Sequence, residues 1–155
     1  MKIQHLIGTA LTCLSLQLTT LHAMVPELKP VVAYARVFDA RYGGYFTGST
    51  ITPGFKGQIA LIGVDVEDNG TGNGKNKVII QKYPDASSNQ FKTAFSNNDL
   101  LQKVIIQIIK PETGQPVPKT FKIYSLKNAY IKSIGAVDGY EVITTIAEAI
   151  DVEDI

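Results

Sequence analysis

Two nearly identical apolar runs in the middle of the chain constrain its fold more than any other feature. KVIIQ occurs at residues 77–81 and again at 103–107, with a polar segment of different rhythm between the two copies. Each copy is short, apolar and β-branched, which favours an extended strand over a helix. Pro84 follows the first copy and Pro111 the second, and proline interrupts a strand ladder. The chain therefore repeats a strand on either side of a different element.

The element between the two runs has the pattern of a capped helix. Ser87 precedes the first turn and Gln90 follows three residues later, which is the spacing of a capping box. Phe91, Ala94 and Phe95 then fall at i, i+3 and i+4, on one helical face. The residues predicted for the helix cap and the core face are Asp85, Ser87, Gln90, Phe91, Ala94 and Phe95.

The rest of the chain is predicted to be extended. Strand-like runs begin at residue 31 and at residue 58, and residues 119–137 alternate in the same way. Asp138-Gly139 has the signature of a two-residue hairpin turn. A helix is conceivable over residues 144–155, but their β-branched density favours a strand. The sum is about seven strands and one helix, which predicts a mainly β fold: a small β-barrel of two packed antiparallel sheets with one short α-helix at the side.

Residues 1–23 have the pattern of a secretory signal peptide. Lys2 precedes an uncharged apolar run that closes on Ala23, a small residue suited to cleavage. Threonine, serine and glutamine side chains interrupt the run, which disfavours a transmembrane anchor. A lipoprotein would need Cys13 as the modified residue, but Cys13 lies inside the run. We predict an exported protein, periplasmic or secreted, with no membrane anchor after cleavage and one domain over residues 24–155.

Cleavage would remove the residues on which much protein chemistry depends. Both histidines, His5 and His22, and the one cysteine lie before residue 24, and the chain has no tryptophan. Nucleophilic catalysis of the serine–histidine or cysteine–histidine kind needs an imidazole base, and the usual zinc sites need cysteine or histidine. The sequence therefore predicts no enzyme, no metal and no cofactor.

The charge balance disfavours nucleic acid as a partner. Cleavage removes one lysine from 15 basic residues and none of the 14 acidic ones, which leaves 14 of each. A neutral chain has no long-range field to attract nucleic acid, and it has little self-repulsion to oppose association with its own copies.

A long polar loop follows the strand that begins at residue 58. It contains no apolar residue, and its glycines and asparagines predict an exposed loop that is longer than a hairpin needs. The candidate contact residues of this loop are Glu67, Asp68, Asn69, Gly70, Thr71, Gly72, Asn73, Gly74, Lys75 and Asn76. A calcium site in the loop 65–74 is the alternative. In an EF-hand alignment with Glu67 in the first position, however, Val78 occupies the twelfth position, where a bidentate glutamate is required.

The segment 77–109 resembles the haemolysin-coregulated protein family, Hcp, whose members are tube subunits of type VI secretion systems. The matching features are the basic strand end, the aspartate-x-x-serine helix start, the helix face and the valine-like strand start: Lys82, Asp85, Ser88, Phe91, Ala94, Phe95, Val104, Ile106 and Ile108. FKGQIALIGVDVE at 55–67 and FKIYSLKNAYIKSI at 121–134 extend the resemblance over most of residues 31–155.

This resemblance implies an Hcp-like β-barrel with one flanking helix. It also implies a homo-oligomer, a hexameric ring, that stacks into a hollow tube, with the loop 67–76 in ring-to-ring contacts and with secretion baseplate or effector proteins as further partners. Two features differ from the family pattern: the signal peptide, and the segment RVFDARYGGYFTGSTITPG at 36–54 in place of a short strand and a lysine–glycine–glutamate turn.

Two other functions remain open on the sequence. One is a monomeric secreted binding module or effector that uses the barrel as a scaffold and the loops 39–56 and 67–77 as its contact surface. The other is a hydrolase built on a carboxylate pair drawn from Asp39, Asp65, Asp99 and Glu141. Any domain of this size offers such pairs, so a structural or binding protein is favoured over a hydrolase.

Overall fold

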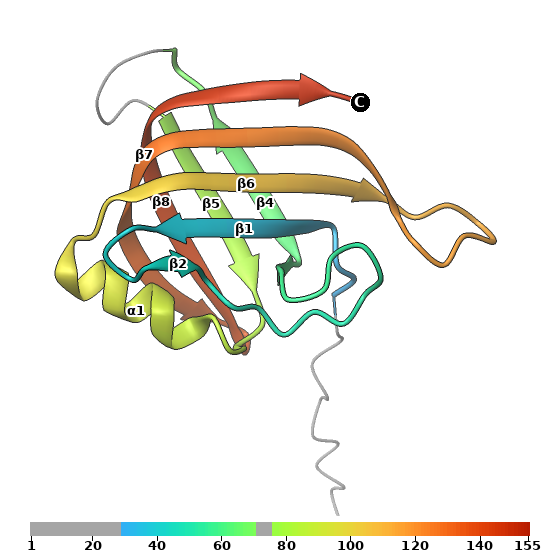
Figure 1. Cartoon of the computed structure of the whole chain (residues 1–155), viewed down its shortest axis with the longest axis horizontal. Helices are drawn as coiled ribbons and strands as arrows, with labels where there is room; N and C mark the ends of the chain where they lie inside the picture. The colour runs from blue at the N-terminus through green and yellow to red at the C-terminus, as the bar shows by residue number, and fades with distance from the viewer. Residues whose placement is uncertain (1–28, 71–75) are drawn as a thin grey trace, which may run out of the picture.

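The computed structural model describes residues 29–70 and 76–155. Over these residues the chain forms eight strands and one helix (Figure 1). The elements are β1 (Ala33–Asp39), β2 (Gly44–Tyr45), β3 (Ile59–Leu61), β4 (Gly63–Glu67), β5 (Asn76–Lys82), α1 (Ser88–Asn97), β6 (Leu101–Lys110), β7 (Lys119–Val137) and β8 (Tyr140–Asp154). The predicted signal peptide lies outside the described residues. None of the helices in the described part of the chain is long and apolar enough to cross a membrane.

The strands form one antiparallel sheet that folds into two layers. The order is β2-β1-β6-β7-β8-β5-β4, and β3 pairs separately with β1. Both β7 and β8 are long enough to take part in both layers, because residues 141–147 of β8 pair with β5 whereas residues 149–154 pair only with β7. The front layer contains β1, β2, β6, the amino-terminal half of β7 and the carboxyl-terminal half of β8, and β4 and β5 lie behind it (Figure 1).

The predicted mainly β fold class is confirmed, but the sheet is not closed by a ladder of strand pairs. Its two ends are connected by the chain itself: β3 pairs with β1, and β4, which starts two residues after β3 ends, pairs with β5. Between them the Ile62 amide donates to the Gln81 carbonyl at 2.8 Å. The chain thus leaves one end of the sheet and joins the other within a few residues.

Several local predictions are confirmed. The Asp138-Gly139 pair makes the two-residue turn between β7 and β8, with φ of 49° and 84°, so both residues adopt the left-handed conformation that this turn requires. Residues 144–154 are a strand, and the segment between the two KVIIQ runs contains α1.

The repeated run explains how the core is filled. The two copies lie on β5 and β6, which are not neighbours in the sheet, and each directs its valine and its second isoleucine inward. Val78, Ile80, Val104 and Ile106 therefore belong to one buried cluster. Burying four aliphatic side chains of this size contributes about 1.5–3 kcal/mol each. The repetition supplies the two sides of one core.

Helix α1 covers one end of the layers with a narrower face than predicted. Phe91 and Ala94 are buried, and Phe91 meets Phe46 edge-on with ring centroids 5.1 Å apart. Phe95, predicted on the same face, is 42% exposed. The reason is a small rotation of the packed stripe toward Gln90, which is buried and bonded to the loop after β2.

Candidate functional site

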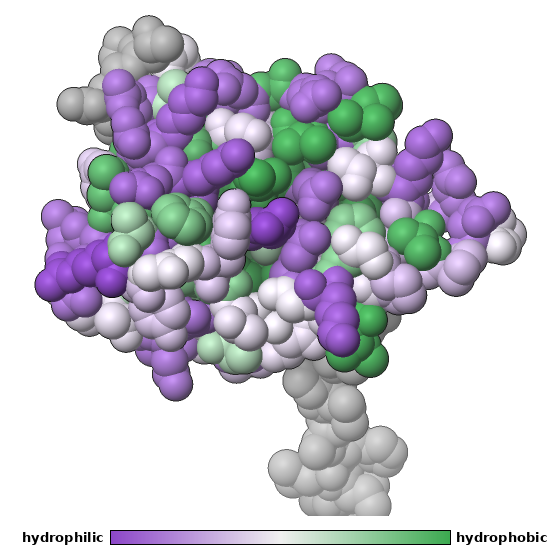
Figure 2. Space-filling view, in the orientation of Figure 1, coloured by the Kyte–Doolittle hydropathy of each residue, from purple (hydrophilic) through white to green (hydrophobic). Residues whose placement is uncertain are grey.

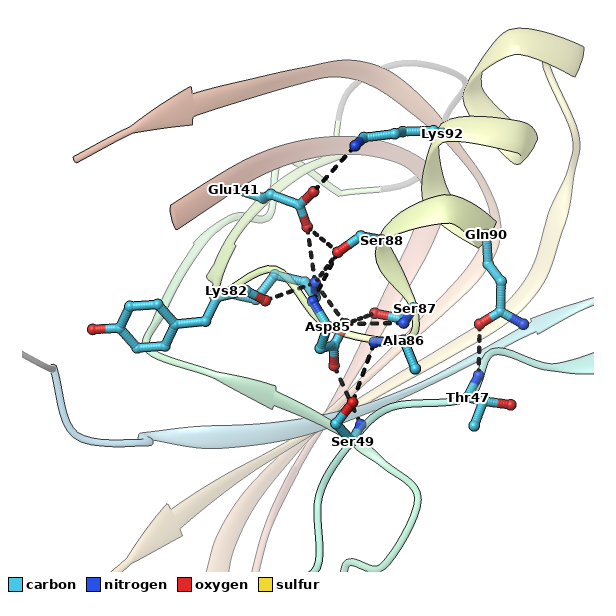
Figure 3. Close-up of polar contacts among 11 residues, drawn as sticks. Thr47, Ser49, Lys82, Asp85, Ala86, Ser87, Ser88, Gln90, Lys92 and Glu141 are labelled. Atoms are coloured by element: carbon cyan, nitrogen blue, oxygen red, sulfur yellow. Dashed lines mark hydrogen bonds and ion pairs between the residues drawn. The ribbon is translucent and has the colours of Figure 1, made fainter. Parts of the chain in front are cut away.

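A buried lysine lies at the junction of β5, β8 and α1 (Figure 3). Lys82 continues the inward alternation of Val78 and Ile80, so its side chain enters the core and is 0% exposed. Its ammonium group donates to Glu141 Oε2 at 2.8 Å and to the Tyr83 carbonyl at 2.9 Å. It also forms an ion pair with Asp85 Oδ1 at 2.8 Å and a hydrogen bond to Ser88 Oγ at 3.1 Å. A buried charge is tolerated when it is surrounded by acceptors in this way.

Ser88 connects this lysine to the start of the helix. Its hydroxyl donates to Glu141 Oε2 at 2.8 Å and accepts the Asp85 amide at 2.9 Å. The Ser88 amide in turn donates to the Asp85 carbonyl at 3.1 Å. The aspartate-x-x-serine motif noted in the sequence is therefore a closed turn that positions the first residue of α1 over the lysine.

The pKa values of both carboxyl groups in the cluster, Asp85 and Glu141, are lowered from their ordinary values. Burial acts to raise the pKa of the Glu141 carboxyl, but hydrogen bonds from Lys82 and Ser88 outweigh it, and the pKa is lowered. Burial likewise acts to raise the pKa of the Asp85 carboxyl, and hydrogen bonds from Lys82 and Ser87 lower it overall. The cluster thus favours the paired, charged state of its members.

The predicted capping box is wrong in its hydrogen bonds, although Ser87 does occupy the N-cap position. The Ser87 side chain makes no cap hydrogen bond to the helix, because its hydroxyl donates to Asp85 Oδ1 at 2.6 Å. Gln90 does not reach back to Ser87; its Oε1 accepts the Thr47 amide at 2.8 Å (Figure 3). The stronger acceptor, the Asp85 carboxylate, has displaced the local cap.

The polar loop is held at its base by a buried asparagine. Asn76 is 0% exposed, and its side-chain amide donates to the carbonyl groups of Gly70, at 2.6 Å, and of Glu148, at 3.2 Å. Its Oδ1 accepts the Asn69 amide at 2.8 Å. Asp68 Oδ1 accepts the Gly70 amide at 3.1 Å. These bonds connect both ends of the loop to β8, while Thr71, Gly72, Asn73, Gly74 and Lys75 lie outside the described residues.

Most of the carboxylates considered for metal binding or hydrolysis have structural partners, and Asp65 is exposed. Glu67 pairs with Lys77 at 2.6 Å, and Asp99 pairs with Arg41 at 2.7 Å. Asp39 Oδ1 accepts the amides of Arg41 and Tyr42 and so shapes the turn after β1. Over residues 29–70 and 76–155, no three His, Cys, Asp or Glu side chains gather as a metal site would require.

Sequence reasoning missed the pairing of Lys82 with Glu141, although one signal was present. Strict alternation along β5 puts Lys82 on the same face as two core residues, and a lysine there requires a buried acid. The partner lies 59 residues away and no local pattern identifies it. The enclosed ammonium group is out of reach of a substrate, so this arrangement joins two strands and a helix.

Comparison with known proteins identifies the family to which the chain is similar. The family described as "Type VI secretion system effector, Hcp" matches residues 40–153. A comparison with curated protein sequences finds no match.

Solved structures of similar fold include three Hcp proteins. An Hcp1 protein from E. coli EAEC 042 aligns with a TM-score of 0.64 at 13% identity, covering 81% of this chain and 98% of that chain. The secreted protein Hcp3 from Pseudomonas aeruginosa aligns with a TM-score of 0.61 at 20% identity, covering 79% and 98%. Hcp1 from Salmonella typhimurium aligns with a TM-score of 0.64 at 12% identity, covering 81% and 88%. At these identities the likeness is one of fold.

Replacing the buried cation is expected to destabilise the domain strongly. Lys82→Met keeps the side-chain volume but leaves the buried Glu141 carboxylate and the partly buried Asp85 carboxylate without their counter-ion, which costs about 3–5 kcal/mol. Lys92→Met is the matched control, because Lys92 is 61% exposed and its ion pair with Glu141 Oε1 is long, at 3.8 Å. For this variant we expect a change in the free energy of unfolding within about 0.5 kcal/mol. Urea unfolding followed by circular dichroism measures both. Equal stability of the two variants would contradict the role assigned to Lys82.

Acid is expected to weaken the same junction. Because the pKa values of Glu141 and Asp85 are lowered in the folded chain, their contribution is fully present above their ordinary values of 4.5 and 3.8 and is lost as the pH falls below them. The free energy of unfolding should therefore decrease below about pH 4.5. Glu141→Gln, which cannot titrate there, should show a shallower decrease than the natural chain. Identical pH profiles of the two proteins would show that Glu141 is not coupled to folding.

Proposed function

The chain belongs to the Hcp family of type VI secretion proteins, and on that premise we propose that it is a structural subunit that assembles into rings and stacked tubes. The observation that carries this proposal is the family match over residues 40–153, which takes in all of β2 to β7 and most of β8. The family is a structural, secreted one. Ring formation by six copies, and contacts with baseplate or effector proteins, are the finer parts of the proposal.

The surface of the subunit supports association. Large apolar side chains are exposed around the sheet, and association would remove them from water. They include Tyr42, Tyr45, Phe121, Tyr130, Val137, Val152 and Ile155. Figure 2 shows apolar side chains interspersed with hydrophilic ones over the front layer. Mixed surfaces of this kind are typical of interfaces between subunits that fold before they assemble.

We assign the loop 67–76 to contacts between stacked rings. Its base is rigid because Asn76 bonds both to Gly70 and to β8. A loop with a fixed base can present polar groups to a neighbour at low entropic cost. The contact would use the described residues Glu67, Asp68, Asn69, Gly70 and Asn76 together with the segment between them.

Export is the second finer part of the proposal. We propose that residues 1–23 direct the chain across a membrane and are removed, and that residues 24–155 fold as the single domain. A monomeric secreted binding module is the competing function, and the same experiment separates the two.

One preparation tests both parts. Full-length chain is expressed in a Gram-negative host, recovered from the periplasm or the medium, and studied by mass spectrometry. Under denaturing conditions we expect the mass of residues 24–155, because cleavage follows Ala23. Under native conditions we expect a species of six subunits. A single subunit at high concentration would contradict the ring, and an intact Met1 would contradict the signal peptide.

Shortening the loop is expected to separate stacking from folding. Replacement of residues 71–75 by two glycines keeps Asn76 and Gly70, so the thermal unfolding midpoint and the native mass of the ring should be unchanged. Filament length in negative-stain electron micrographs should decrease, because the contacts between rings are lost. The matched control replaces residues 113–116, in the connection between β6 and β7, by two glycines. Filaments of natural length in the loop variant would refute the assignment.

A further inference from the structure

The exposed acidic residues are concentrated on one side of the molecule. Seven of the 14 acidic residues lie in the segments 65–68 and 148–154: Asp65, Glu67, Asp68, Glu148, Asp151, Glu153 and Asp154. The two segments are close in space because the Asn76 side chain bonds to the Asn69 amide and to the Glu148 carbonyl. Glu67, Asp151 and Asp154 form ion pairs with Lys77, Lys127 and Lys122. The acids of this side that lack a lysine partner among the described residues are Asp65, Asp68, Glu148 and Glu153.

The carboxyl-terminal half of β8 is an open edge on this acidic side. In the described part of the chain, residues 149–154 pair with β7 and with no other strand. The Ile155 amide donates to the Phe121 carbonyl in β7, whereas the Glu148 carbonyl faces Asn76 on the other side. By the alternation of an antiparallel strand, the backbone groups of Ile150, Val152 and Asp154 then point to the open edge. An edge of this kind invites a partner.

The opposite end of the front layer is basic and aromatic. Across this layer the strands run β8, β7, β6, β1, β2, so the β1–β2 hairpin and the β8 edge lie at opposite ends (Figure 1). The hairpin presents Arg36, whose guanidinium lies 4.3 Å from the ring centroid of the exposed Tyr45. Arg41 follows, 67% exposed and paired with Asp99. Arginine and tyrosine are among the residues enriched in subunit interfaces.

The side chains of Arg36, Asp151 and Glu153 project from the same face of the front layer. Arg36 is in register with Ile105, Ile105 with Ser125, and Ser125 with Asp151, and residues directly opposite in a sheet share a face. Glu153, two residues beyond Asp151, shares that face as well. Asp151 is already paired with Lys127 at 2.6 Å. Arg36 has no carboxylate partner, and Glu153 no cationic one, among the described residues.

We propose that the β8 edge of one copy docks against the β1–β2 hairpin of a second copy, with Glu153 pairing with Arg36. The two surfaces differ, so the contact is head-to-tail, and a head-to-tail contact closes into a ring when its rotation allows. In a symmetric dimer of two β8 edges, the unpaired Glu153 of each copy would meet a like charge, which opposes that dimer. This inference rests on the proposed function and names the surfaces that the ring uses.

A charge exchange tests the contact. Arg36→Glu and Glu153→Arg are each expected to raise the concentration at which half of the protein is assembled by about tenfold or more, because each places like charges opposite each other. The double variant should return to within about threefold of the natural chain. An equimolar mixture of the two single variants should co-assemble, since each supplies the partner charge that the other lacks. Sedimentation velocity and native mass spectrometry measure these outcomes.

The control is Lys132→Glu, an exposed position on β7 with the same change of charge as Arg36→Glu; it should assemble like the natural chain. Circular dichroism verifies that each variant is folded, and Glu153→Arg alone is sufficient if Arg36→Glu fails to fold. Assembly of the natural chain with no effect of Glu153→Arg overturns this contact and leaves the proposed function intact. Failure of the natural chain to assemble overturns both.

Discussion

A charged amine inside an apolar core requires oxygen acceptors around it, and this requirement at Lys82 fixes how three parts of the chain meet. Lys82 is the last residue of β5, Asp85 and Ser88 form the turn into α1, and Glu141 is the second residue of β8. Each acceptor is of limited value alone, but the loss of any one leaves part of a buried charge without compensation. The start of the helix is therefore determined by a contact with two strands, and the cap that its own sequence suggests is not formed.

Patterns within a few residues were sufficient to predict most of the secondary structure. The alternation of the two KVIIQ runs, the Asp138-Gly139 turn and the helical spacing of Phe91 and Ala94 each depend on local geometry, and each is confirmed. Contacts between distant segments were not predictable. Gln90 is buried and bonds to Thr47, 43 residues away, on the side of α1 that faces the core. Phe95 is exposed for a reason that its own neighbourhood in the sequence does not contain.

The layered shape was predicted only in outline, for a similar reason. β7 and β8 are single extended runs in the sequence, yet both layers share them. The register of β7 shifts between Ile131 and Ser133, where no glycine or proline marks an irregularity. The transfer of the chain between the two ends of the sheet occurs at Ile62 and Gly63, and a single glycine inside an extended run does not specify such a transfer. Curvature of a sheet follows from its packing, and packing depends on all of its strands at once.

The charged side chains fall into two groups: those that are paired inside the chain, and those that are left for a partner. At the junction of β5, β8 and α1 each charge is compensated inside the chain, so electrostatics there contributes to the fold and offers nothing to a partner. On the open edge of β8 and on the β1–β2 hairpin, Glu153 and Arg36 lack such compensation, and they lie at opposite ends of one layer. Composition cannot distinguish these cases, because it reports how many charged residues there are and not where they lie. The difference lies in where the counter-charges are: a subunit that satisfies its interior and leaves complementary charges at its two ends is matched best by another copy of itself.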